Sequence, residues 1–356
     1  MRVVNISNLK GDEKIGKQVF DNTGRILLNA GTKLSQFSID KLISLGIQSV
    51  YIDDEISKEV VIDEAVSENI RQMGKYALKE TMEKYSKIGT SDNSDIVKAV
   101  NSIIDEVFSN KNTLVNATEI RTCCNSVFSH SVNVCVLSSL VGIHMGYNML
   151  KLKDIALGAI LHDIGKIIIQ NDKKTLLEFN SKKDSDIYIE SMHPKIGHDF
   201  LGRENFCSTH SKMAVLMHHE KVDGTGYPLK LKGNDINEIA KLVSVCNTFV
   251  NLISGKGNEP SKSVNEAVKQ ISQMSGYSFD DTIVKTLTMN VATYPSGTGV
   301  VLNTNESGLV LRQNLSMPLR PVVKVLLDKA GEPIAEPYEM DLLKESNILI
   351  KGNCEL

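Results

Sequence analysis

The chain has 356 residues, of which 41% are hydrophobic, and its formal net charge is −3. This length is enough for two or three domains with buried cores. The slightly negative charge argues against a general electrostatic attraction to DNA or to an anionic membrane.

Cysteine usage and hydropathy narrow the class further. The six cysteines include no C-x-x-C pair, so neither a disulfide framework nor a zinc ribbon is predicted. No apolar run approaches the roughly 20 residues that cross a bilayer. Lys10, Asp12 and Lys14 interrupt the N-terminal segment too early for a signal peptide. A cytoplasmic protein without a membrane partner is therefore expected.

Residues 1–55 are predicted to form a small mixed α/β domain. Residues 17–20 and 25–28 have the character of short strands, and the sequence Asn22-Thr23-Gly24 between them is a hairpin signal. A helix is expected over residues 32–45, opening near Ser35, and a further strand over residues 49–52. The domain holds no phospho-acceptor or cofactor motif, so a sensory role and a packing or homodimer role are both open.

Residues 56–115 are charged and favour helix, with a break at residues 89–94. No long heptad run appears in this segment. We therefore predict a helical linker made of a connecting pair of helices, in preference to a coiled-coil signalling linker.

Residues 116–290 contain a series of histidines next to apolar helical segments. His130 shares one helical face with Val127, Val134, Leu137 and Val141. An imidazole on such a buried face needs a partner for its nitrogens.

The other histidines of this series follow at intervals. His162 and Asp163 end the apolar run 155–161, and Lys166 follows one helical turn later. His193 precedes Pro194, where a proline can open a helix. His218 and His219 end the apolar run 213–217.

Any one of these histidines alone would be a satisfied core residue, and a lone His-Asp pair would be a cap or a surface ion pair. Together they favour a metal site inside a helical bundle. Imidazole and carboxylate ligands suit Fe, Mn or Zn, whereas carboxylates alone would suit Mg or Ca. His144, His198 and His210 lie in polar or glycine-containing surroundings and are assigned no chemistry.

From residue 291 to 356 the pattern changes to short apolar runs bounded by turns, such as residues 300–302, 308–311, 322–327 and 348–350. This pattern is typical of strands. The predicted fold is thus mainly α, a helical metal domain flanked by a small N-terminal mixed β domain and a C-terminal β subdomain.

The ordered motifs resemble those of the HD-GYP family, the helical HD-superfamily phosphodiesterases that hydrolyse cyclic di-GMP. The matching strings are His130-Ser131 with Asn133-Val134, His162-Asp163-Ile164-Gly165-Lys166, His193-Pro194 with Ile196-Gly197, His218-His219-Glu220 and Asp223-Gly224-Thr225-Gly226-Tyr227-Pro228. The resemblance implies a set of metal ligands: His130, His162, Asp163, His193, His218 and His219. It also implies that Lys166 faces the substrate phosphate and that Gly226-Tyr227-Pro228 forms a loop beside the site, which is also a candidate contact for a signalling partner.

The sequence departs from the family pattern at several positions. Asn247 stands where the family has an Asp that bridges the metals, and a neutral amide there should weaken at least one metal position. Ser126 replaces a Glu found in three-metal members, which argues against a third ion. Lys256 stands in the segment that usually carries an Arg-rich phosphate contact, and it lacks the bidentate fork of Arg.

The resemblance predicts a metal-dependent phosphodiesterase that converts cyclic di-GMP to pGpG, GMP or both. Two divalent ions, Fe or Mn, would bridge a water, lower its pKa and clamp a phosphate oxygen, with one ion as the alternative if Asn247 weakens the second position. Asp163 could accept the proton of that water, and Lys166 would offset charge on the phosphoryl group. Tyr227 could stack on a guanine or merely shape its loop. The rival prediction is a degenerate binding protein, which acts as a cyclic-dinucleotide sensor or as a protein-interaction module and does not hydrolyse the nucleotide.

Overall fold

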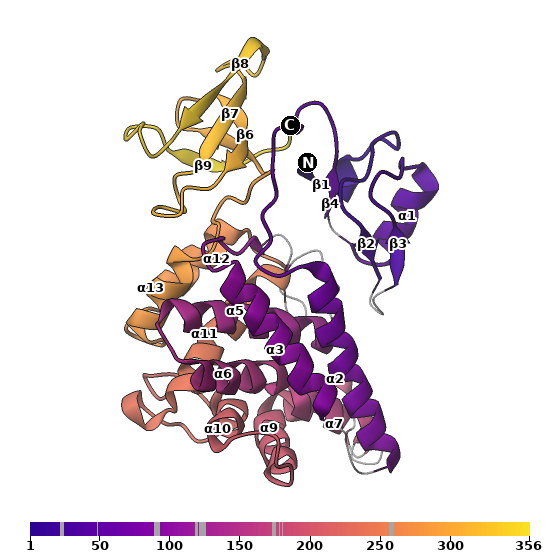
Figure 1. The fold of residues 1–356 in the computed structure, drawn as a ribbon, viewed down its shortest axis with the longest axis vertical. Helices are drawn as coiled ribbons and strands as arrows, with labels where there is room; N and C mark the ends of the chain where they lie inside the picture. The colour runs from indigo at the N-terminus through magenta and orange to yellow at the C-terminus, as the bar shows by residue number, and fades with distance from the viewer. Residues whose placement is uncertain are drawn as a thin grey trace.

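The structure is a computed structural model, and it describes residues 1–21, 25–47, 49–88, 93–117, 120, 126–172, 176–177, 179, 181–255 and 260–356. Figure 1 shows a helical body with two smaller β-containing units at one end of it. The two chain termini lie near each other between these units (Figure 1), and the Arg2 side chain donates a hydrogen bond to the carbonyl of Leu356. The mainly α fold with flanking β units is confirmed.

Within residues 1–21, 25–47 and 49–55, the N-terminal unit contains two short antiparallel pairs of strands and one α-helix. Strand β1 (Arg2–Asn5) pairs with β4 (Ser49–Ile52), and β2 (Val19–Phe20) pairs with β3 (Ile26–Leu28). A 3-10 turn (Ile6–Asn8) follows β1. Helix α1 (Gln36–Ser44) begins after Ser35, whose hydroxyl accepts from the Ser38 N–H. The predicted strands and helix start are confirmed, while the turn at residues 22–24 lies outside the described residues.

The helical body is held together by one large apolar core around α5 (Val127–His144). In the part of the body that the structure describes, the other helices are α2 (Glu68–Ile88), α3 (Ser94–Ser109), α6 (Met149–Leu161), α7 (Ile164–Asn171), α9 (Lys182–Gly202), α10 (Thr209–Met217), α11 (Glu238–Ser254), α12 (Val264–Gln273) and α13 (Asp281–Met289), with a 3-10 turn at Gly233–Asp235. Helices α3, α6 and α11 all contact α5. This packing places the N-terminal end of α5 beside the ends of α6 and α10.

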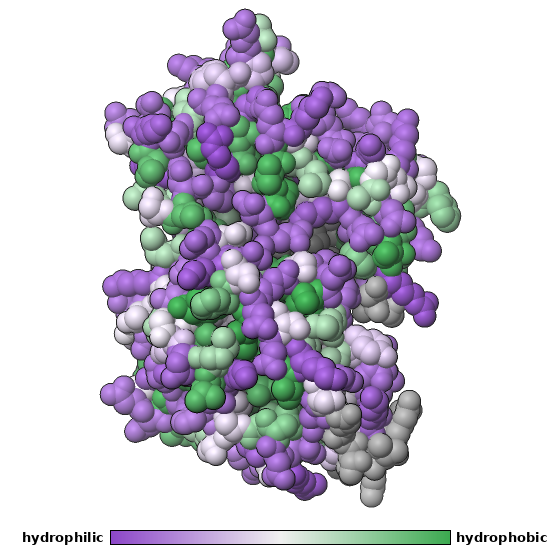
Figure 2. Space-filling view, in the orientation of Figure 1, coloured by the Kyte–Doolittle hydropathy of each residue, from purple (hydrophilic) through white to green (hydrophobic). Residues whose placement is uncertain are grey.

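Helix α5 is long and apolar enough to cross a membrane by length and composition, and 72% of that 18-residue window is buried inside the fold. Burial by neighbouring helices is what a core helix requires. Hydrophilic residues cover most of the face shown in Figure 2, and hydrophobic ones are interspersed in small groups. The apolar sequence of α5 is therefore explained by its place in the core.

Helices α2 and α3, predicted as a connecting pair, also contribute to the main core. Ile96, Val100, Ile103 and Val107 of α3 are buried and recur at three- and four-residue spacing. Arg71 of α2 is 1% exposed, the largest fully buried side chain among the described residues. Arg71 apart, the described charged residues of these two helices are exposed or partly exposed, and the spacing of the apolar residues between them explains the burial of the inner face.

The C-terminal unit is a five-stranded antiparallel sheet in the order β8-β7-β6-β5-β9. Its strands are β5 (Gly299–Leu302), β6 (Ser307–Arg312), β7 (Val322–Leu327), β8 (Pro333–Asp341) and β9 (Ile350–Asn353). Alternate residues such as Val323 and Val325 bury one face. The predicted C-terminal β subdomain is confirmed, and the proposed domain boundaries remain predictions.

Candidate metal centre

Helices α6 and α7 meet at His162 and Asp163. His162 caps the C-terminus of α6, and Asp163 is the first residue before α7. Both are buried, with 0% and 3% exposure. Gly165 lets α7 approach α9, because a Cβ at this position would lie 2.0 Å from the carbonyl oxygen of His193. The sequence His-Asp-Ile-Gly-Lys therefore both supplies polar side chains and permits the close helix contact that places them.

His193 occupies the interior of α9, and the prediction that Pro194 opens a helix is wrong. Pro194 lies inside this helix of 21 residues. A proline there removes one backbone hydrogen bond, leaving the carbonyl four residues earlier without its helical donor. The preceding carbonyl, that of Ile189, accepts from His193 Nδ1 at 2.9 Å. Packing of α7 against α9 fixes this segment, and such a tertiary contact leaves no local sequence signal.

The remaining predicted ligands reach the same place from three other elements. His218 caps the C-terminus of α10, and His219 follows it. His130 lies in the first turn of α5 and is partly buried. Asn247 is buried on α11, and its Oδ1 lies 2.9 Å from His130 Nε2.

Backbone carbonyls fix the orientation of three imidazoles. Nδ1 of His162 lies 2.7 Å from the carbonyl of Ala159, and Nδ1 of His218 lies 2.8 Å from that of Val215. His193 Nδ1 makes a similar bond to the carbonyl of Ile189. Each of the three rings therefore donates through Nδ1 and directs the lone pair of Nε2 into the site. This arrangement is typical of metal-binding histidines, whose second nitrogen is held by an outer partner.

The Nε2 atoms converge on two adjacent positions that share Asp163. On one side, Oδ2 of Asp163 lies 3.4 Å from His162 Nε2 and 3.8 Å from His130 Nε2. On the other side, Oδ1 lies 3.2 Å from His193 Nε2 and 3.8 Å from His218 Nε2. We name these the α5-side set (His130, His162, Asp163, with Asn247 beside them) and the α9-side set (Asp163, His193, His218, His219).

The donor atoms fit a metal ion. Nε2 of His193 and Nε2 of His218 are 3.2 Å apart, although both present lone pairs. Ligand atoms bound to one ion at about 2.1 Å are separated by roughly 3.0–3.4 Å, which is this spacing. Asp163 Oδ1 and His219 Nε2 are buried without a hydrogen-bond partner among the described residues. A cation would satisfy all of these groups, as buried polar atoms require.

Burial and neighbouring charges keep the candidate ligands in the protonation states that bind metal. Burial lowers the pKa of His162, His218 and His219, and that of His130 to about 3, so these rings are neutral near pH 7. The pKa of Asp163 is held well below its usual value: burial acts to raise it, but the neighbouring His162 and Lys166 outweigh that effect. Neutral imidazoles beside an ionised carboxylate are the forms that bind metal.

Lys166 is a partly buried cation at the edge of the centre. Its Nζ donates to Asp163 Oδ2 at 3.0 Å and lies 3.1 Å from Glu190 Oε1. Burial acts to lower the pKa of Lys166, but these two carboxylates raise it above its usual value. Glu190, which the sequence analysis did not single out, comes from α9 and lies one turn before Pro194.

The Gly226-Tyr227-Pro228 loop lies beside the α9-side set. The Tyr227 ring stacks on His219 with centroids 4.6 Å apart and an interplanar angle of 17°. Gly226 is required by close packing, since a Cβ there would lie 2.5 Å from the His219 carbonyl oxygen. Lys256 lies outside the described residues.

Glu220 builds this loop, although the sequence analysis assigned it no role. Its buried carboxylate accepts hydrogen bonds from the N–H groups of Leu229, Lys230 and Leu231 at 2.6, 3.1 and 3.0 Å. Charged acceptors make stronger hydrogen bonds than neutral ones. The position of Glu220 directly after the two histidines is a sequence feature that could have pointed to a role, but the residues that it binds are nine to eleven positions away in the sequence.

The sequence matches the HD domain family over residues 103–283, slightly more than half of the chain. The chain belongs to the HD domain family. Its motifs, from His130 to the Gly226-Tyr227-Pro228 loop, place it among the HD-GYP members. Residues 299–355 match a KOW domain associated with HD domains, and this segment contains the C-terminal sheet.

Several known proteins are similar to this HD domain chain. A cyclic di-GMP phosphodiesterase of Pseudomonas aeruginosa is 28% identical over 258 residues, covering 72% of this chain and 60% of that protein. A cyclic di-GMP phosphodiesterase of Thermotoga maritima is 31% identical over 158 residues, covering 44% and 42%. A solved HDG"Y"P protein from Bdellovibrio bacteriovorus shares 19% identity with a TM-score of 0.48, covering 80% of this chain and 97% of that one. The chain spans about half the length of the two named phosphodiesterases.

Proposed function

We propose that this protein is a metal-dependent phosphodiesterase that hydrolyses cyclic di-GMP to pGpG, GMP or both. The observation that carries the proposal is the pair of donor sets joined by the buried carboxylate of Asp163. Two metal positions that share a ligand suit in-line displacement at a phosphate. The similarity to cyclic di-GMP phosphodiesterases supports this substrate class.

We infer two ions, with Fe or Mn preferred, because the donors are mainly imidazole with one shared carboxylate. The α9-side set would hold one ion through Asp163, His193, His218 and His219. The α5-side set would hold the other less tightly, because Asn247 offers a neutral amide oxygen. When bound, such ions would activate a water and stabilise charge on the phosphoryl group.

A cleft beside the centre can receive the substrate. It has a volume of about 960 Å³ and is lined by Lys182, Lys183, Asp186, Ile187, Glu190, Ser191, Tyr227 and Pro228. This volume is at the upper end of the roughly 300–1,000 Å³ of small-molecule sites. Lys166, held between Asp163 and Glu190, would contact a phosphate, and Pro228 and the outer face of Tyr227 would contact a base. Gly226 keeps this loop close to the metal ligands, and Lys256 is proposed as a further phosphate contact.

The proposal is tested by incubating Mn- or Fe-reconstituted protein with cyclic di-GMP and separating pGpG from GMP. The Lys166→Ala variant should hydrolyse the substrate at least tenfold more slowly while keeping its metal, because the ammonium contributes charge stabilisation rather than a metal ligand. Lys153→Ala, on the neighbouring helix α6, is the matched control and should behave as the parent. Loss of metal with unchanged turnover in Lys166→Ala would contradict this role.

A second candidate is a cyclic-dinucleotide sensor that does not hydrolyse its ligand. The observation that favours it is the contact of Asn247 Oδ1 with His130 Nε2 at 2.9 Å, which satisfies His130 without a metal. Metal content separates the two: two equivalents support the enzyme, whereas one or none, with binding of cyclic di-GMP but no product, supports the sensor.

A further inference from the structure

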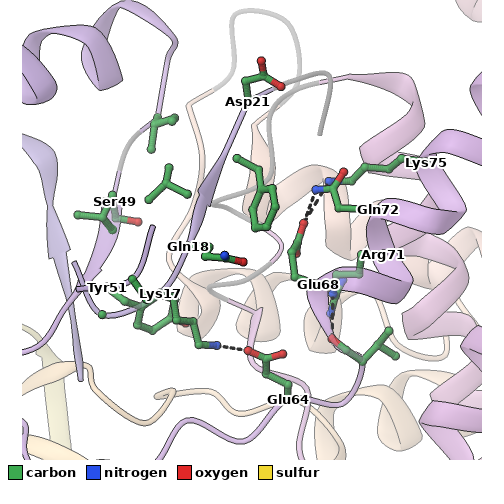
Figure 3. A pocket seen from close by; sticks show the side chains of 17 residues that line it. Lys17, Gln18, Asp21, Ser49, Tyr51, Glu64, Glu68, Arg71, Gln72 and Lys75 are labelled. Carbon is green, nitrogen blue, oxygen red and sulfur yellow. Dashed lines mark hydrogen bonds and ion pairs between the residues drawn. The ribbon is translucent and has the colours of Figure 1, made fainter. Parts of the chain in front are cut away.

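A second cavity lies between the N-terminal unit and helix α2, away from the metal centre. It has a volume of about 390 Å³ and is lined by residues of β2 and β4 on one side and by α2 and the segment before it on the other. Figure 3 shows the side chains of Gln18, Ser49, Arg71 and Gln72 around it. The volume falls within the range of small-molecule sites.

The charged groups in this cavity balance one another. The lining includes three cations, Lys17, Arg71 and Lys75, and three carboxylates, Asp21, Glu64 and Glu68. Lys17 pairs with Glu64 across the two units, and Lys75 Nζ lies 3.6 Å from Glu68. A charged ligand would have to disrupt such pairs and lose its hydration, which is costly in a partly buried site. The balance therefore favours a neutral ligand.

The rest of the lining specifies a ligand with an apolar body. Val19 and Phe20, which are partly buried, contribute aliphatic and aromatic surface, and the buried Val50 and Val66 also line the cavity. The amides of Gln18 and Gln72 also line the cavity (Figure 3). Each amide nitrogen donates one hydrogen bond, to Asn29 and to Glu68 respectively, and an amide has a second N–H and an oxygen that could contact a ligand. Apolar walls with a few placed polar groups are typical of small-molecule sites.

Arg71 links this cavity to the helix that carries His130. Its Nη1 donates to Asn133 Oδ1 at 2.7 Å, and its Nε donates to the Val66 carbonyl at 3.3 Å. Arg71 and Asn133 are 1% and 3% exposed, so this bond is shielded from water. Asn133 lies on α5, three residues after His130, which is nearly one helical turn.

We propose that this cavity binds a small neutral molecule with an aromatic or aliphatic body, and that Arg71 and Asn133 couple its occupancy to His130. A ligand that displaces α2 relative to α5 would act on the α5-side set through this buried bond. Coupling of this kind requires a physical contact whose geometry changes with the state of both sites. The hydrogen bond between Arg71 and Asn133 is the contact that we propose for this role. The coupling, but not the binding, rests on the metal assignment proposed above.

Binding is tested on the full chain with N-phenyl-1-naphthylamine, a neutral fluorophore made of a phenyl and a naphthyl group, whose emission rises in apolar sites. We expect saturable one-to-one binding to the parent and at least tenfold weaker binding to Ser49→Trp and Gln72→Trp, which fill the cavity from opposite walls. The chain contains no tryptophan, so the emission of the introduced residue reports whether each variant is folded with its indole buried.

Phe37→Ser is the matched control, because this ring on α1 is 78% exposed and does not line the cavity. It should bind the probe as the parent does. Absence of saturable binding to the parent would overturn the site. Equal binding to the folded tryptophan variants, or loss of binding in Phe37→Ser, would overturn it as well.

The coupling is tested by measuring Mn²⁺ affinity with and without saturating probe. We expect a change of at least threefold in the parent and in Asn133→Asp, which keeps an acceptor for Arg71, and no change in Asn133→Ala. An unchanged affinity in the parent, or the same change in Asn133→Ala, would overturn the coupling. If the parent bound no Mn²⁺, the metal proposal and the coupling would both fail, while the probe titration would still decide the cavity.

Discussion

Replacing Asn247 by Asp should have opposite effects on the metal-free and the metal-loaded protein. The side chain is 3% exposed, and its Oδ1 lies 2.9 Å from His130 Nε2 and accepts from Asn251 at 2.9 Å. In the metal-free protein a carboxylate there adds a buried charge close to Asp163. We expect the free energy of unfolding to fall by about 3 kcal/mol, the scale of an uncompensated buried charge.

In the loaded protein the same carboxylate faces a cation. An ion bound about 2.1 Å from His130 Nε2 would lie up to about 5 Å from that oxygen, and we take about 4 Å as a representative separation. Two unit charges 4 Å apart interact by about 4 kcal/mol at an effective dielectric constant of 20. Desolvation of the carboxylate and repulsion from Asp163 offset much of this energy. A remainder of about 1.4 kcal/mol would tighten Mn²⁺ binding tenfold.

The assay pairs urea unfolding of metal-free protein with Mn²⁺ titration and cyclic di-GMP turnover of loaded protein. Asn237→Asp is the matched control, since it makes the same change at the N-cap of the same helix, where Asp and Asn cap equally well. Equal Mn²⁺ affinity in Asn247→Asp and the parent would refute the placement of Asn247 beside the ions. Tighter metal binding without any turnover would favour the sensor.

Three further predictions follow from the centre and its loop. Asp163→Asn should reduce the bound metal below half an equivalent by elemental analysis, because both donor sets share this carboxylate; retention of one full equivalent would contradict the sharing. Glu220→Gln should lower the free energy of unfolding by about 2–4 kcal/mol in urea, since one amide oxygen cannot replace a carboxylate that accepts from residues 229–231; a loss under 1 kcal/mol would refute this. Burial lowers the pKa of His162 and His218 in the folded state, so below about pH 6.5 the unfolded chain binds protons that the folded chain does not. The free energy of unfolding of the metal-free protein should therefore fall between pH 7 and pH 5, by up to about 1.4 kcal/mol per pH unit for each imidazole. A free energy of unfolding that does not change over this range would show that these rings are protonated in the folded protein.

The sequence predicted the elements whose signals are local. The apolar spacing around His130 predicted a buried helical face, and Ser35 predicted the start of α1. His162 and Asp163 were placed at the end of an apolar segment, and the structure puts them at the junction of α6 and α7. In each case the residues that decide the structure are within one or two helical turns of one another.

The features that the sequence did not predict depend on distant contacts. Pro194 lies inside α9, where packing of Gly165 against the helix outweighs the local preference of proline for a helix start. Glu190 reaches Lys166 only because α7 and α9 pack together. The link from Arg71 to Asn133 joins residues 62 positions apart. Periodicity within one segment contains no information about such pairs.

The hydrogen bonds of the centre also imply that its two donor sets differ in how readily they bind an ion. In the α9-side set, His193 and His218 already donate through Nδ1, so their Nε2 atoms are available to an ion. In the α5-side set, His130 Nε2 faces two acceptors, the Nε2 lone pair of His162 at 3.2 Å and Asn247 Oδ1 at 2.9 Å. It therefore carries the proton in the metal-free protein and must transfer it to Nδ1 before it can bind an ion. An Asp at position 247 would offset that cost through its charge, whereas the amide does not. The expected order is one tightly held ion at the α9 side and a second at the α5 side only at higher metal concentration. On the two-ion mechanism proposed above, hydrolysis of cyclic di-GMP should rise with the second binding event and not with the first.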